Sequence, residues 1–83
     1  MQTPKQSPNT VLALVRVRQM VASGQARMIR EAAGLSLAEL ASAVGPGVSP
    51  TTVWRWEAGE RQPRGDAAIA YGRLLVRLER EVA

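Results

Sequence analysis

The 83-residue chain contains no cysteine and no histidine. Without cysteine it has neither a disulfide bridge nor a thiol nucleophile. Without histidine it also lacks the commonest zinc ligand and the commonest general base. The remaining side chains offer no positioned base for a nucleophile, so we expect no enzyme, no metal site and no cofactor.

Long apolar runs are also missing. The longest, TVLALVRVRQMVA at residues 10–22, carries Arg16 and Arg18 and is shorter than the roughly 20 residues needed to cross a bilayer. The N-terminal stretch MQTPKQSPN has no apolar core of a secretory signal. The absence of cysteine suits a reducing cytosol, so we expect a cytoplasmic protein with no membrane partner.

Lysine is almost absent, yet the chain is basic. Lys5 is the only lysine, and arginine carries nearly all of the formal net charge of +4. A basic chain favours a polyanionic partner, although a solvated basic surface is the alternative. Arginine suits a polyanionic partner because its planar guanidinium can donate two hydrogen bonds to a phosphate or to a guanine edge.

Glycine and proline divide the chain into stretches with helical periodicity. We expect a flexible arm at residues 1–9 and a single domain at 10–83, because a chain of this length builds one small core. The pattern predicts an all-α fold, a compact bundle of about five helices without strands. Their predicted ranges are 10–22, 25–33, 36–44, 50–58 and 66–83.

Two of these helices begin with capping signals. Ser36 and Glu39 have the spacing of a capping box, and Ser49 followed by Pro50 suits an N-cap and a first helical position. A short glycine-containing turn separates the two helices, which predicts a helix-turn-helix unit at about residues 36–58.

Periodicity also predicts which faces are buried. In the helix at 10–22 the apolar stripe comprises Val11, Leu14, Val15 and Val21. In the last helix, capped by Asp66, it comprises Ala67, Ala70, Tyr71, Leu74, Leu75, Leu78 and Val82. In the helix at 50–58 the inward face comprises Val53, Trp56 and Glu57, and the outward face comprises Thr51, Trp54, Arg55 and Ala58.

The run IREAAGLSLAELASAVG…VSPTTVWRWEAGERQPRG resembles the lambda-repressor-like helix-turn-helix family, also called the Cro/C1 or xenobiotic-response-element type. The likeness covers roughly residues 26–74 and is strongest in AGLSLAELA and WEAGERQP. It implies that the second helix of the unit enters the major groove of double-stranded DNA. We therefore expect a sequence-specific, small transcriptional regulator, Cro-like or repressor-like, from a phage or prophage, acting in a bacterial cell or phage-infected host.

The resemblance assigns base reading to the outward side chains of residues 50–58. Arg55 is placed to bind O6 and N7 of guanine, and Thr51 to touch a base edge or methyl group. Trp54 would lie against a sugar or a thymine methyl group; the alternative is that it only covers a neighbouring helix. Thr52 is expected to contact phosphate or simply to cap the helix.

Arg61 and Arg64, and more weakly Gln62, follow the reading helix and are expected to contact the DNA backbone. The alternative for each is a solvated loop side chain. The resemblance also implies a largely buried ion pair between Arg30 and Glu57.

Four features depart from the family pattern. Trp54 stands where the family more often has a small polar residue. Pro50 stands where a polar base reader is common, and Leu37 replaces a glutamine that grips a phosphate. The turn between Gly45 and Ser49 is two residues longer than usual.

Surplus apolar surface on the terminal helices, at Leu12 and Val17 or at Ile69 and Val76, predicts a homodimer on DNA. No small-molecule ligand is expected. Two other functions stay open. One is an antitoxin-type protein-interaction module with autoregulatory DNA binding, and the other is an excisionase-like DNA-bending factor.

Overall fold

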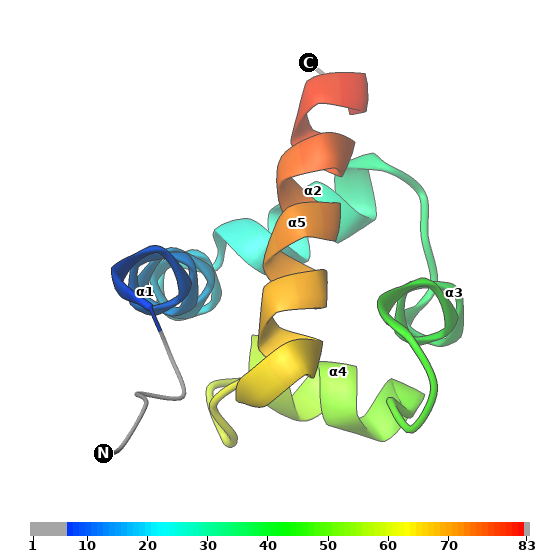
Figure 1. Ribbon diagram of the computed structural model, residues 1–83. Helices are drawn as coiled ribbons and strands as arrows, with labels where there is room; N and C mark the ends of the chain where they lie inside the picture. Colours follow the sequence, from blue (N-terminus) through cyan, green and yellow to red (C-terminus); the bar gives the residue numbers. More distant parts are fainter. Residues whose placement is uncertain (1–6, 83) are drawn as a thin grey trace.

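The computed structural model describes residues 7–82, which form five α-helices and no strand (Figure 1). The expected all-α fold is therefore confirmed. Helix α5 runs through the middle of the molecule, with α1 on one side of it and α3 on the other (Figure 1). The helices are α1 Pro8–Ala22, α2 Gln25–Ala32, α3 Leu37–Val44, α4 Pro50–Glu57 and α5 Gly65–Val82.

Helix α1 begins earlier than the sequence predicted. The Ser7 side chain accepts a hydrogen bond from the Thr10 amide at 3.2 Å, and Pro8 occupies the first helical position. A serine N-cap followed by proline is a strong helix start, so residues 7–9 belong to the helical domain and not to an arm. The rest of the predicted arm, residues 1–6, lies outside the described residues.

Helix α5 also begins one residue before the predicted start. Its first residue is Gly65, which places Asp66 in the first turn and not at the N-cap. The carboxylate still lies at the helix end where the backbone dipole favours negative charge.

The buried face of α1 differs from the predicted stripe. Leu14 and Val21 are buried as expected, whereas Val11 and Val15 are 45% and 43% exposed. Val17 and Met20 are buried in their place. The reason lies in α5, where a Cβ atom added to Gly72 would come within 3.2 Å of the Val17 Cβ atom. The glycine lets the two helices approach closely, and this contact turns the Val17 face inward.

The core of α5 centres on Tyr71 and Leu75, both predicted, and on Ala68, which was not. Val82 is 41% exposed, because the last turn of α5 extends beyond the helices packed around it (Figure 1). Tyr71 packs against Trp56 of α4 with ring centroids 4.7 Å apart. Trp56 is thus a core residue, as predicted. Burial raises the pKa of Tyr71, whose hydroxyl has no hydrogen-bond partner among the described residues.

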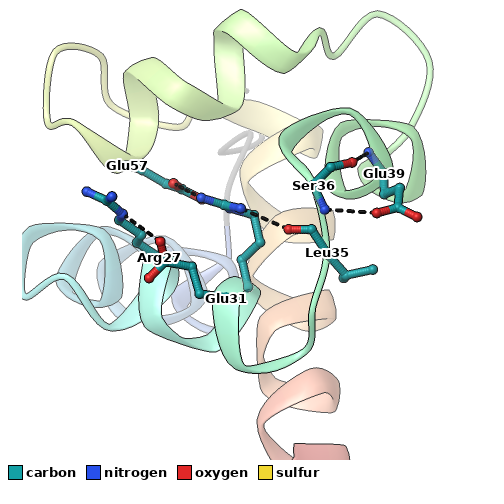
Figure 2. Close-up of polar contacts among 7 residues, drawn as sticks. Arg27, Glu31, Leu35, Ser36, Glu39 and Glu57 are labelled. Atoms are coloured by element: carbon teal, nitrogen blue, oxygen red, sulfur yellow. Dashed lines mark hydrogen bonds and ion pairs between the residues drawn. The ribbon is translucent and has the colours of Figure 1, made fainter.

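The predicted ion pair between Arg30 of α2 and Glu57 of α4 is present (Figure 2). Arg30 Nε lies 2.6 Å from Glu57 Oε2, and Nη2 lies 3.0 Å from Oε1, so the contact is bidentate. The two side chains are only 12% and 4% exposed. Hydrogen bonding to Glu57 raises the pKa of Arg30. The third guanidinium nitrogen, Nη1, donates to the Leu35 carbonyl oxygen at 2.8 Å.

Replacing Glu57 by glutamine should lower the free energy of unfolding by about 3 to 5 kcal/mol, because Arg30 would keep its charge in a buried place without a counter-charge. Urea unfolding followed by circular dichroism measures this change. The matched control is Glu31→Gln, since Glu31 pairs with Arg27 at 3.2 Å on an exposed helix surface. The control should cost less than about 1 kcal/mol. Equal stability of Glu57→Gln and wild type would show that the buried pair does not hold the fold.

Candidate nucleic-acid interface

The first helix of the helix-turn-helix unit, α3, starts at a complete capping box (Figure 2). The Glu39 amide donates to Ser36 Oγ at 3.0 Å, and the Ser36 amide donates to Glu39 Oε1 at 2.9 Å. The hydrogen bond from the Ser36 amide lowers the pKa of Glu39. These reciprocal bonds fix the point at which α3 begins, as the sequence predicted.

The long turn after α3 is held by local backbone bonds. The Gly45 amide donates to the Ala41 carbonyl at 3.3 Å, and the Val48 amide donates to the Gly45 carbonyl at 3.3 Å. Gly47 has φ = +83°, which favours glycine. The two additional residues therefore form a closed turn between α3 and α4.

Ser49 starts α4. Its hydroxyl oxygen accepts from the Thr52 amide at 3.1 Å and lies 3.0 Å from the Thr52 hydroxyl. Thr52 is thus engaged in the cap and is half-buried. Capping was one of its two predicted roles; the phosphate contact stays a prediction.

The two faces of α4 are separated as predicted. Val53 and Trp56 are buried, and the Glu57 side chain is 4% exposed. On the opposite face Thr51, Trp54, Arg55 and Ala58 are exposed. One short helix therefore holds itself in the core through one face and presents a polar and aromatic surface on the other.

The loop after α4 contains the residues predicted to contact phosphate, and interactions near its start and near its end fix its position. At its start the Arg55 carbonyl accepts from the amides of Glu60 at 2.9 Å and Arg61 at 3.3 Å. Near its end Pro63 is fully buried. The Pro63 carbonyl accepts from Arg18 Nε at 3.3 Å and Nη2 at 3.2 Å.

Arg61, Gln62 and Arg64 are all exposed on this anchored loop. Together with Arg55 they give the end of α4 and its loop an arginine-rich surface. Glu60 is the one exposed carboxylate between residues 55 and 64. Such a surface suits the backbone of a nucleic acid, because arginine can replace the counterions of phosphate groups.

Sequence reasoning missed the part played by Arg18. The available signal was an arginine inside an apolar helix, since a charged group in such a position usually has a partner. Its partner lies 45 residues further along the chain, so only the fold could identify it.

Among residues 7–82 no group of three or more carboxylates or other metal-ligating side chains is placed to hold a metal ion. Within the same residues no helix is both long and apolar enough to span a membrane.

Replacing Arg18 by methionine should loosen the loop, because methionine keeps the packing of the stem and removes both bonds to Pro63. Hydrogen exchange at the amides of Glu60 and Arg61 should then accelerate about tenfold, as expected if the two bonds that share the Pro63 carbonyl together contribute roughly 1.5 kcal/mol. The control is Arg16→Met, whose arginine is exposed on the same helix. Equal exchange in the two variants would show that Arg18 does not anchor the loop.

A family model described as a helix-turn-helix domain matches residues 22–83. No curated protein and no solved structure matches the chain. The matched residues cover α2 to α5 and so include the whole unit formed by α3, the turn and α4. Domains of this type bind DNA and are typically not catalytic, and the match agrees with the Cro/C1-type resemblance of the sequence. The chain therefore belongs to the helix-turn-helix domain family.

Proposed function

We propose that this protein is a small transcriptional regulator, Cro-like or repressor-like and of phage or prophage type, which binds specific double-stranded DNA sites in a bacterial cell. The observation that carries the proposal is the exposed face of α4. Thr51, Trp54 and Arg55 lie there, while the opposite face is fixed in the core. A helix held in this way fits the width of the major groove.

The proposed DNA contacts divide into those that read bases and those that bind the phosphate backbone. Arg55 reads guanine through two hydrogen bonds, and Thr51 contacts a neighbouring base edge. Arg61, Arg64 and Gln62 contact phosphate groups, which orients the protein without reading sequence. This division is supported by position, since Arg55 lies on the reading helix and the other three lie on the loop behind it.

Replacing Arg55 by alanine should weaken binding to the best site by about 1 to 3 kcal/mol and remove the preference at one base pair. Replacing Arg61 by alanine should instead weaken binding to all DNA sequences equally, and it should lower the salt dependence of binding by about one counterion. Binding isotherms on a selected genomic site and on a scrambled duplex, each at two salt concentrations, separate the two effects.

The matched control for lost charge is Arg80→Ala, because Arg80 is exposed near the C-terminal end of α5, away from α4. This variant should change the sequence preference and the salt dependence of binding only slightly. An equal loss on both duplexes for Arg55→Ala would remove Arg55 from base reading.

We also propose that two copies bind DNA as a symmetric dimer through the outer face of α1. Val11, Leu12 and Val15 lie on that face and are 45%, 66% and 43% exposed. Val17, earlier a candidate for this contact, is fully buried. Leu12 also borders a groove between α1 and α5 that Ile69 and Val76 line, and three arginines, Arg16, Arg73 and Arg77, line the same groove. Stacking two such grooves would bring like charges together, which disfavours that dimer.

The dimer predicts two half-sites about one helical turn, or roughly 34 to 36 Å, apart. Leu12→Glu should abolish the dimer in sedimentation experiments and reduce the footprint to a half-site. The control is Met28→Glu, which places the same charge on an apolar residue that is 68% exposed on α2. One wild-type chain per duplex, on a single unrepeated half-site, would refute the dimer.

A further inference from the structure

A shallow apolar hollow of about 230 Å³ lies where the helix-turn-helix unit presents the start of both helices. Leu37 is the first residue of α3, and Pro50 and Thr51 are the first two residues of α4. Trp54 completes the lining and is 48% exposed. Leu37 is half-buried, and the only polar side-chain groups of the four are the Thr51 hydroxyl and the indole N–H of Trp54.

The geometry of α4 explains why these side chains meet. Trp54 follows Thr51 by three residues and Pro50 by four, so all three lie on one face of the helix. Helix α3 packs against α4, and this packing brings Leu37 from the other helix to the same place. The hollow therefore depends on the packing of α3 against α4.

The hollow is continuous with the proposed reading surface, since Trp54 precedes Arg55 and shares the exposed face of α4 with it. Its size is below the roughly 300 Å³ of ordinary small-molecule pockets. A half-exposed tryptophan in such a place favours an apolar partner. In the major groove, the apolar group on natural base edges is the methyl group at C5 of a pyrimidine.

We propose that the hollow formed by Leu37, Pro50, Thr51 and Trp54 binds the 5-methyl group of a pyrimidine, in thymine or in 5-methylcytosine, near the base pair that Arg55 contacts. This proposal rests on the proposed DNA-binding function and assigns the chemistry of one further base position. Leu37 and Pro50 have no side-chain hydrogen-bond donor or acceptor, so this part of the surface selects by apolar contact and shape.

A methyl-group scan of the selected binding site tests the proposal. Each thymine is replaced in turn by deoxyuridine, which removes only the methyl group, and each cytosine by 5-methylcytosine, which only adds it. For the wild-type protein one position per half-site should show about fourfold tighter binding with the methyl group, the ratio expected for burying one such group. Thymine and 5-methylcytosine are distinguished by which of the two replacements changes the affinity.

The variants Trp54→Ala and Leu37→Ala link the effect to the hollow through a double-mutant cycle. In each of them the ratio between methylated and unmethylated duplex should fall from about fourfold to about one. The control is Arg55→Ala, which should bind more weakly but keep the ratio, because Arg55 does not line the hollow. Circular dichroism melts of both variants check that they remain folded.

Specific binding that is insensitive to every methyl replacement would overturn this proposal and leave the proposed function intact. The same conclusion would follow if folded Trp54→Ala and Leu37→Ala both kept the wild-type ratio. Failure of the wild-type protein to prefer any duplex sequence would overturn the proposed function, and this proposal with it.

Discussion

The proposed reading surface on α4 depends on the buried ion pair between Arg30 and Glu57, because Glu57 is the last residue of α4 and Arg30 fixes that end from α2. The same guanidinium donates to the Leu35 carbonyl, just before the Ser36 cap of α3. One side chain of α2 thus contacts both the segment that precedes α3 and the end of α4. A buried pair gives no guarantee of net stability, but removing one partner is costly, so the arrangement favours a single position of α4.

Two further contacts hold α4 and its loop. Trp56 packs on Tyr71 of α5, and Arg18 of α1 holds the carbonyl of Pro63. With its inner face fixed by α2, α5 and the core, α4 can keep its outer side chains exposed without losing position. A binding surface on a rigid element loses little conformational freedom when the partner arrives, which favours specific recognition.

Much of this arrangement follows from local sequence. The caps at Ser36 and Ser49 depend on residues three positions apart, so their spacing alone predicts where α3 and α4 begin. In α4 helical spacing places Val53 and Trp56 on one face and Trp54 with Arg55 on the other, which determined the inward Trp56 and the outward Trp54. The pairing of Arg30 with Glu57 came from the family resemblance, since no local rule joins residues 27 positions apart.

The tertiary structure decided what local rules leave open. Apolar residues surround much of α1, so periodicity fits more than one buried face; the close approach at Gly72 selects Val17 over Val15. The partner of Arg18 and the convergence of Leu37 with Trp54 also join residues distant in sequence. The sequence by itself determined the helices, their starts and the two faces of α4, because these depend on contacts within a few residues. Only packing decided which surfaces meet, because that depends on the shape of the partner helix.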